Sequence, residues 1–510
     1  MTMRNDDPNR PRPNYRGWNV TAGLIFAIAA LFVAPAIGLE ISAAFTNTDG
    51  RVTWLNLFVG VFLLACLFWW LLMSWPERFS LWRGAVTGVL VAFFAYPGVL
   101  ALAEFVQRDW FDGASIPPLA ERIDNTLLVA GLTLMTTGFL ATPISAIIGM
   151  ATTWALVHFH PLMAAEAARN TQRRSPLMRI LQRLAAVLAV AIVLALAGSF
   201  AWLSWTPLDT DGLDIQASEI GPATTYEQSI AAYELVQARE AQLPLHERCP
   251  STLLTHGSKV ARVVIYFHGF TSCPAQGDAF AEQLFALGYN VYLPRMFGHG
   301  EADPMTLSLI ELTADKLVDL ANESTDLVQG LGDEVVVVGL SAGGTIASWT
   351  AQYRRDVDQA VIVSPFLGPY VVPPWAMSAA HNLTLMLPNL VLWWNPLENV
   401  PADQIDYAFP RPATHALAEI MRLGRIVQDS AADNPPAVKR IGVLLNEADV
   451  AVSNALTLDL VADWRDHGAD VRVQTLPFDR HLPHDLINPR EQHGDPALVY
   501  PLLIEMMNAP

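Results

Sequence analysis

The chain has 510 residues, of which 52% are hydrophobic and 16% are charged, and its formal net charge is −18. The charge is unevenly distributed, because residues 1–205 contain 14 Arg, no Lys and 11 acidic residues, whereas residues 206–510 contain 17 basic and 38 acidic residues. A strongly acidic surface repels phosphate groups, which excludes nucleic acid as a partner of the second half.

The first 205 residues are predicted to form a membrane domain. A helix needs about 20 apolar residues to cross the hydrocarbon core of a bilayer. Five stretches meet this requirement, and charged residues occur only at their ends. They are residues 20–39, 53–75, 84–106, 126–150 and 184–205. We expect five transmembrane helices over residues 20–205, after a cytoplasmic segment at residues 1–19, and the lack of charge within them favours an anchor over a transporter.

The arginine residues indicate how these helices are oriented. Eleven of the 14 Arg lie on the side that includes the N-terminus, and three lie on the other side. Because basic residues are enriched on the cytoplasmic side of a membrane, the N-terminus is predicted to be cytoplasmic. Five crossings then place everything after residue 205 outside. A cleaved signal peptide is the alternative for the first stretch, but the four later stretches favour an uncleaved helix.

The second half has the pattern of an α/β domain. Residues 206–250 are interpreted as a linker and a helix, which opens with a capping-box-like Thr224-Thr225-Tyr226-Glu227. From residue 260 onward, apolar β-rich runs such as DEVVVVG and RIGVLLNEAD alternate with helical stretches. This alternation is typical of a mostly parallel, doubly wound sheet covered by helices on both faces. Ligands of such sheets bind at the carboxyl ends of the strands.

One of these runs ends in a motif that indicates nucleophilic catalysis. The stretch VVVVGLSAGG, residues 335–344, passes from a strand through a Gly-x-Ser-x-Gly turn into a helix. The glycines permit a crowded turn that exposes the hydroxyl of Ser341 above the sheet. A serine nucleophile also needs a base, and the base needs an acidic partner.

The acid and the base are expected after later strands, in the chain order serine, acid, histidine. Asp449 follows the strand IGVLL, and His484 follows the strand VRVQTL. Glu447 remains an alternative acid and His481 an alternative base. We prefer His484 because it lies just before the apolar run Leu486-Ile487-Asn488, where the last helix could start.

Two backbone amides are expected to stabilise the oxyanion of the reaction. One is the amide of Ala342, next to the nucleophile. The other is the amide of Phe270, in the loop that follows the strand VVIYF. His268 precedes this loop and is interpreted as structural.

Residues 260–490 resemble the α/β-hydrolase superfamily. The motifs FHGFTSCPAQ, LPRMFGHGE, GLSAGG, NEADV and LPHD are similar, in the same order, to those of the bacterial carboxylesterase and monoacylglycerol-lipase branch. The resemblance implies an α/β-hydrolase fold with a helical cap. It implies the triad Ser341, Asp449 and His484, the oxyanion donors Phe270 and Ala342, and a structural turn at Gly298-His299-Gly300. The membrane region is a departure, because soluble enzymes of that branch lack it.

The family places its cap between two strands, of which one ends here at Pro365 and the next begins at Arg440. The resemblance therefore implies a cap insertion at about residues 367–438. This part of the chain is unusually apolar and includes LTLMLPNLVLWWNPL, residues 383–397. Three interpretations stay open: packing within the cap, a pocket for an acyl chain, or a face that rests on the bilayer.

These observations lead to one favoured hypothesis and two alternatives. The favoured one is a serine hydrolase anchored in a bacterial inner membrane, whose hydrolase domain, residues 251–510, faces the periplasm or the exterior and cleaves acyl or lipid esters. The alternatives are an acyltransferase with the same triad and a non-catalytic membrane sensor or assembly protein. Membrane lipids would contact the N-terminal helices, and no metal or organic cofactor is expected. In an oxidising compartment Cys249 and Cys273 could form a disulfide; the alternative is two free thiols.

Overall fold

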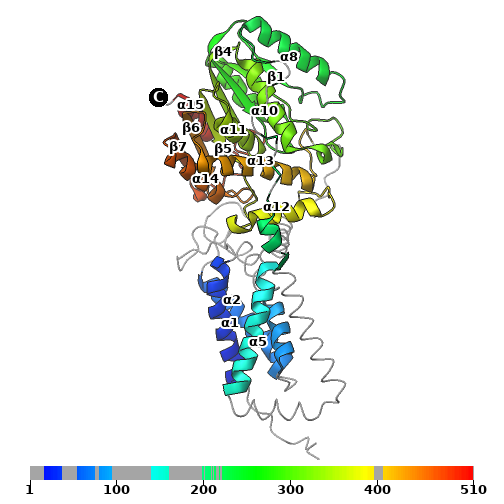
Figure 1. Ribbon diagram of the computed structural model, residues 1–510, viewed down its shortest axis with the longest axis vertical. Helices are drawn as coiled ribbons and strands as arrows, with labels where there is room; N and C mark the ends of the chain where they lie inside the picture. Colours follow the sequence, from blue (N-terminus) through cyan, green and yellow to red (C-terminus); the bar gives the residue numbers. More distant parts are fainter. Residues whose placement is uncertain are drawn as a thin grey trace, which may run out of the picture. The chain divides into compact units, whose positions relative to one another are not determined.

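The computed structural model of the protein is shown in Figure 1. It describes residues 16–36, 54–74, 80–92, 94, 139–159, 198–199, 201–207, 209, 210, 212, 213, 218, 221–394 and 406–508. The chain divides into two compact units, residues 1–199 and residues 200–510. The second unit holds all the residues that the sequence nominates for catalysis.

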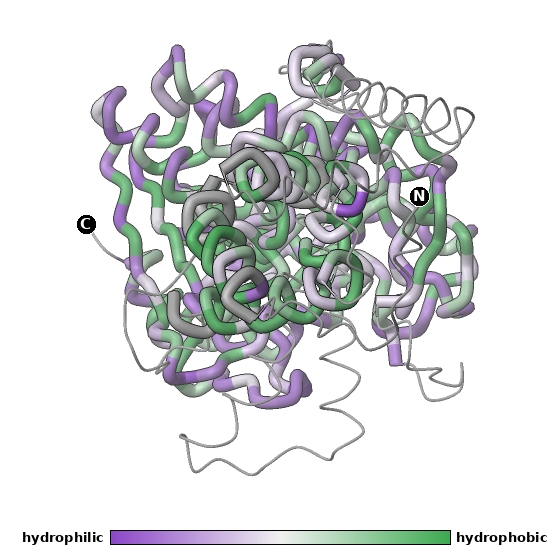
Figure 2. Tube along the Cα trace, turned by 90° about the horizontal axis from the view of Figure 1, so that it is seen from below, coloured by the Kyte–Doolittle hydropathy of each residue, from purple (hydrophilic) through white to green (hydrophobic). Residues whose placement is uncertain are grey.

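The described part of the first unit consists of apolar helices (Figure 2). They are α1 (Arg16–Ala36), α2 (Trp54–Trp69) with its π-helical continuation Trp70–Ser74, a helix at Leu81–Ala92, and α5 (Phe139–Phe159). Within the described residues, Leu57–Ser74 is the one helical stretch that is both long and apolar enough to cross a membrane. Most of the predicted span at residues 184–205, and large parts of those at 84–106 and 126–150, lie outside the described residues, so the five-helix membrane domain stays a prediction.

The helix at Leu81–Ala92 and α5 approach each other at glycine residues. A Cβ atom added to Gly84 would lie 2.4 Å from the carbonyl oxygen of Gly149, and one added to Gly88 would lie 1.9 Å from the carbonyl oxygen of Ser145. Gly84 and Gly88 are four residues apart and therefore share one helix face. This is the small-xxx-small pattern by which membrane helices bring their backbones together.

A single methyl group at this crossing is expected to destabilise the first unit. Alanine is a better helix former than glycine by about 1 kcal/mol, but overpacking a tight contact costs about 1–3 kcal/mol. Gly88→Ala should therefore lower the thermal unfolding midpoint of the detergent-solubilised protein. Gly198→Ala is the control, since no atom of the described residues lies within 4 Å of an added Cβ there. Equal midpoints for the two variants would contradict the close helix crossing.

The second unit is built on a seven-stranded sheet with the order β1-β3-β2-β4-β5-β6-β7. The strands are β1 (Thr252–Leu254), β2 (Val260–Phe267), β3 (Asn290–Leu293), β4 (Gly332–Leu340), β5 (Gln359–Val363), β6 (Arg440–Asn446) and β7 (Asp470–Leu476). All neighbouring pairs are parallel except β1 and β3. The predicted mostly parallel sheet is confirmed. The short antiparallel edge strand β1 was not predicted, because three residues carry no detectable periodicity.

Helices cover both faces of this sheet (Figure 1). They are α8 (Tyr226–Glu240), α9 (Asp278–Ala286), α10 (Ala314–Val328), α11 (Ala342–Tyr353), α13 (Thr414–Asp433), α14 (Asn454–Asp466) and α15 (Pro496–Asn508). Helix α12 (Met377–Met386) lies within the predicted cap insertion and contacts α13. Side chains alternate between faces along a strand. In β2, Ile265 and Phe267 belong to a core cluster with side chains of α8, α10, α11, α13 and α14, whereas Val264 and Tyr266 belong to a second cluster with side chains of α9 and α15.

Two local details differ from the sequence interpretation. Helix α8 does begin after Thr225, whose hydroxyl accepts a hydrogen bond from the Gln228 amide. The side chain that bonds back is that of Gln228 rather than Glu227, and its Oε1 atom accepts from the amide of Thr224. The expected cap insertion includes α13, yet α13 packs with α11 in the core over the sheet. It therefore belongs to the helical layer that covers the sheet, and the name cap is kept below for residues 367–413, which precede it.

Candidate active site

Ser341 lies between the end of β4 and the first residue of α11, in a backbone conformation that is rare for a residue with a side chain. Its φ and ψ angles are 58° and −117°. Glycines make this turn possible: a Cβ atom added to Gly343 would lie 2.0 Å from the carbonyl oxygen of Phe267, and one added to Gly339 would lie 2.0 Å from that of Gly343. Ser341 is about 9% exposed. The geometry is that of a nucleophile elbow, which presents the hydroxyl at the carboxyl edge of the sheet.

Asp449 and His484 meet in the loops that follow β6 and β7. The Nδ1 atom of His484 lies 2.6 Å from Oδ2 of Asp449. The other carboxylate oxygen, Oδ1, accepts hydrogen bonds from the amides of Ala451 and Val452, which fixes the orientation of the carboxylate. An imidazole that donates from Nδ1 has Nε2 left to accept a proton. The strand order places β4, β5, β6 and β7 side by side, so Ser341 and this pair lie at the same edge of the sheet.

The contact between His484 and Asp449 raises the pKa of the histidine and lowers the pKa of the carboxyl group. Both shifts favour a histidine that can accept a proton next to an ionised carboxylate. Burial alone would lower the pKa of His484, but the charge of Asp449 and the hydrogen bond to it raise the pKa above its ordinary value, and Asp485 and Glu491 act in the same direction. Burial would raise the pKa of Asp449, but the imidazole of His484 and two backbone amides hold it below its ordinary value. Asp449 is therefore ionised at neutral pH and stabilises a protonated imidazole.

The alternative acid and base have other contacts. The carboxylate of Glu447 accepts a hydrogen bond from the Phe478 amide. His481 has a left-handed backbone conformation, with φ of 47°, and its ring lies edge-on against Phe478. Among the described residues, the carboxylate that contacts His484 is that of Asp449.

The loop that follows β2 has the local structure expected of an oxyanion loop. The carbonyl of Gly269 accepts hydrogen bonds from the Ser272 amide and from Nδ1 of the fully buried His268. Because the amide and carbonyl of a trans peptide point in opposite directions, these bonds turn the Phe270 amide away from Ser272. Burial lowers the pKa of His268 well below its ordinary value, and its Nε2 accepts from the Met296 amide. His268 is thus a neutral structural residue, and Ala342 begins α11.

Two residues that the sequence did not single out hold the loop of His484. The side-chain amide of Asn446, at the end of β6, donates to the carbonyls of Leu482 and Pro483. The side-chain amide of Gln276 donates to Asp485, on the other side of His484. Amide side chains occur throughout protein sequences, so no sequence signal distinguishes these two before their partners are known.

A disulfide and the cap also reach the oxyanion loop. Cys249 and Cys273 are bonded, with their Cα atoms 5.4 Å apart, and both are fully buried. The bond ties the loop after β2, which is the predicted oxyanion loop, to the segment before β1. From the cap, the indole of Trp394 donates to the hydroxyl of Thr271, and the Phe409 amide donates to the Thr271 carbonyl.

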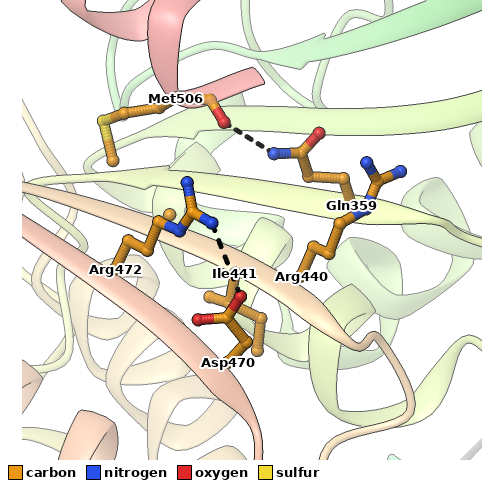
Figure 3. Close-up of a pocket in the computed structure, with 7 residues that line it drawn as sticks. Gln359, Arg440, Ile441, Asp470, Arg472 and Met506 are labelled. Atoms are coloured by element: carbon orange, nitrogen blue, oxygen red, sulfur yellow. Dashed lines mark hydrogen bonds and ion pairs between the residues drawn. The ribbon is translucent and has the colours of Figure 1, made fainter. Parts of the chain in front are cut away.

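Two further kinds of site could hold a ligand among the described residues: a hollow elsewhere on the sheet and a metal-binding cluster. A hollow of about 10 Å³ lies at the amino ends of β5, β6 and β7, where Gln359 contacts the Met506 carbonyl and Arg472 pairs with Asp470 (Figure 3). It is at the opposite edge of the sheet from Ser341. No group of three His, Cys, Asp or Glu side chains that could hold a metal ion occurs among the described residues.

Comparisons with known proteins match this part of the chain. Residues 258–474 match the model of a family described as serine aminopeptidase, S33. A thermostable monoacylglycerol lipase from Bacillus sp. (strain H-257) is 31% identical over 94 residues, which are 18% of this chain. The chain thus covers 36% of the length of that relative.

Solved structures with a similar fold include lipolytic enzymes. A structure from work on LipS and LipT, two metagenome-derived lipolytic enzymes, is 16% identical with a TM-score of 0.41, and the match covers 52% of this chain and 100% of that one. A soluble variant of monoglyceride lipase from Saccharomyces cerevisiae is 14% identical with a TM-score of 0.39, over 50% of this chain and 88% of that one.

The charge pair predicts a specific pH dependence. A base must be neutral to accept a proton, so kcat/KM for an ester should fall as the pH drops through a midpoint above 6.5, the ordinary value for histidine. Asp449→Asn removes the charge that raises the pKa of His484. The midpoint should move to lower pH, and kcat should fall by about 10⁴-fold. Glu447→Gln is the control and should leave the profile in place. An unchanged midpoint in Asp449→Asn would contradict the pairing.

Proposed function

We propose that this protein is a membrane-anchored serine hydrolase that cleaves carboxylic esters of apolar acyl groups. The observation that carries the proposal is the 2.6 Å contact between His484 and Asp449 at the sheet edge where Ser341 occupies its strained turn. The similarity of residues 258–474 to a serine peptidase family supports a serine nucleophile. The similarity to a monoacylglycerol lipase supports an acyl ester as the substrate class.

The proposed reaction proceeds through an acyl-enzyme. The Ser341 oxygen attacks the ester carbonyl while Nε2 of His484 takes the hydroxyl proton. The tetrahedral intermediate collapses, the bond to the alcohol breaks, and His484 returns the proton to the departing alcohol. A water molecule then repeats the attack with His484 as base and releases the acid. Asp449 remains ionised throughout and stabilises the imidazolium.

The amides of Phe270 and Ala342 are proposed to receive the developing negative charge. Ala342 is the first residue of α11, and the first amides of a helix have no acceptor within the helix. The partial positive charge at this helix end adds to the stabilisation. Donors that are already oriented, in a site from which water is excluded, are worth more than the same groups in water.

The cap supports an apolar substrate. Residues 367–397 contain no Asp, Glu, Lys or Arg. Several of its large apolar side chains are exposed, and they are Trp375, Leu383, Met386, Leu387, Leu390, Leu392 and Trp394. A monomeric water-soluble protein rarely exposes so many neighbouring apolar residues. We propose that this apolar surface faces lipid and delivers acyl chains to the site.

The described helices of the first unit support anchoring. Val20, Leu24 and Ile28 form an exposed stripe on α1, and Val59, Leu63 and Leu67 form another on α2. Side chains on the opposite faces of these helices are buried and apolar as well. A helix that is hydrophobic all round needs an apolar environment, and the hydrocarbon of a bilayer provides one.

The last apolar segment is linked to the cap within the second unit. The side-chain amide of Asn382 in α12 donates to the carbonyls of Leu203 and Thr206, which lie at the end of the short helix at residues 201–205. Trp202 and Trp205 in this segment are exposed, as aromatic residues at a membrane interface are. If the predicted fifth span ends here, the cap lies at the membrane surface.

We further propose that the hydrolase domain lies outside the cytoplasm of a bacterial inner membrane. The distribution of 11 Arg against three supports a cytoplasmic N-terminus and an odd number of crossings. The disulfide between Cys249 and Cys273 supports an oxidising compartment for the domain, because such bonds are rare in the cytosol.

Substitutions in the triad test the chemistry. Ser341→Ala should abolish labelling by a fluorophosphonate and lower p-nitrophenyl ester turnover by several orders of magnitude, because triad members act as a unit. His484→Ala should lower turnover to a similar level, whereas His481→Ala, the matched control, should retain most of it. Wild-type turnover in Ser341→Ala would overturn the nucleophile assignment. A large loss of turnover in His481→Ala, together with a small loss in His484→Ala, would show that His481 rather than His484 is the base.

Reporter fusions test the topology. A C-terminal alkaline phosphatase fusion should be active, and a C-terminal green fluorescent protein fusion should be dark, because the C-terminus is expected outside the cytoplasm. Fusions after residue 80 are the internal control, since two crossings return the chain to the cytoplasm and the pattern should reverse. A fluorescent C-terminal fusion would mean an even number of crossings.

A further inference from the structure

Gln276 lies at the centre of a buried hydrogen-bond bridge. It belongs to the short helical turn Pro274–Gly277 and is about 4% exposed. Its Oε1 atom accepts from the Gly269 amide at 2.7 Å and from the Tyr266 hydroxyl at 3.2 Å. Its Nε2 atom donates to Oδ2 of Asp485 at 2.7 Å. One side chain therefore joins the loop after β2 to the loop after β7.

On the first side, the bridge acts on the peptide next to the oxyanion donor. The carbonyl of Gly269 is fixed by the Ser272 amide and by His268, and its amide is fixed by Gln276. Gly269 is thus constrained at both polar atoms, and the Phe270 amide belongs to the peptide that follows. A Cβ atom added to Gly269 would lie 3.3 Å from Nε2 of Gln276 and 3.7 Å from Cβ of Ser341. Gly269 therefore lies between the bridge and the nucleophile.

On the second side, the bridge acts on the residue after the base. The other carboxylate oxygen of Asp485 accepts from the amides of Ile487 and Asn488, which closes a turn directly after His484. Asn446 holds the two carbonyls before His484. The loop after β7 that carries His484, residues 477–488, is called the base loop here. It is fixed before His484 by Asn446 and after His484 by Gln276, through Asp485.

We propose that Gln276 is a positioning residue that sets the oxyanion loop and the base loop into one shared geometry around Ser341. This inference rests on the serine hydrolase function proposed above. The side chain must present an acceptor to Gly269 and a donor to Asp485 at once. A neutral amide does so at every pH at which the enzyme works, whereas a carboxylate in the same place would oppose the carboxylate of Asp485.

The bridge can be tested by exchanging its two ends. Gln276→Glu keeps an acceptor for Gly269 but loses the donor to Asp485. Asp485→Asn keeps an acceptor for Ile487 and Asn488 but turns an amide toward the amide of Gln276. The double variant Gln276→Glu/Asp485→Asn restores the contact with the donor on the other side, since the amide of position 485 can donate to the new carboxylate.

The measurements separate positioning from folding. Active sites are counted by fluorophosphonate titration, and kcat and KM for a p-nitrophenyl ester are measured per titrated site at the pH plateau. The inhibition constant of an alkyl trifluoromethyl ketone, whose adduct with the serine carries an oxyanion, is measured in parallel. Each single variant should lower kcat per site by about ten- to a hundredfold, as small misplacements do, with KM unchanged and ketone binding weakened by a similar factor. The double variant should recover both.

Each outcome separates this inference from the proposed function. Single variants that keep the wild-type kcat per titrated site and bind the ketone normally would overturn the positioning role, even if fewer sites titrate. If the fold-losses in kcat of the two single variants simply multiply in the double variant, the two side chains do not act through a shared contact. That result would overturn the bridge. A wild-type protein that neither reacts with fluorophosphonate nor turns over esters would instead overturn the proposed function.

Discussion

The left-handed backbone of Ser341 is the constraint on which the rest of the site depends. A residue with a side chain adopts such a conformation only at a cost of about 1–3 kcal/mol. Hydrogen bonds that involve other parts of the fold offset that cost: the Ser341 amide donates to the Val363 carbonyl, and the Ser341 carbonyl accepts from the amides of Thr345 and Phe366. The pairing of β5 with β4 therefore helps to stabilise the turn. The position of the serine hydroxyl is a property of the completed sheet.

The other elements of the site are arranged around this turn by the order of the strands. Because β4 is central and β2, β5, β6 and β7 lie beside it in parallel, the loops that follow these strands open onto one edge. The loops are then joined by side chains: Asp449 contacts His484, Asn446 holds the residues before His484, and Gln276 contacts the residue after it through Asp485. Backbone topology brings the groups near one another, and these polar contacts set their orientation.

The sequence predicts the elements that have a local pattern and misses those that depend on distant partners. The mostly parallel sheet was predictable because buried parallel strands are continuous apolar runs, as in Val335 to Val338. Strand β1 was not, because it exists only through its pairing with β3. Ser341 is marked by its flanking glycines, but Gln276 and Asn446 have no such mark, since their importance comes from atoms more than 35 residues away. The pairing of Cys249 with Cys273 stayed open for the same reason, because sequence separation does not report distance.

The disulfide has a consequence for when the loop after β2 acquires all of its constraints. Cys273 lies in the same loop as Phe270, so the covalent tie to Cys249 is part of what holds that loop. In the topology we propose, the two thiols reach an oxidising compartment only after the domain has crossed the bilayer. A newly made chain inside the cell would then carry an oxyanion loop without this tie, while surrounded by the cell's own acyl esters. In that topology, oxidation after export would add the covalent tie to this loop.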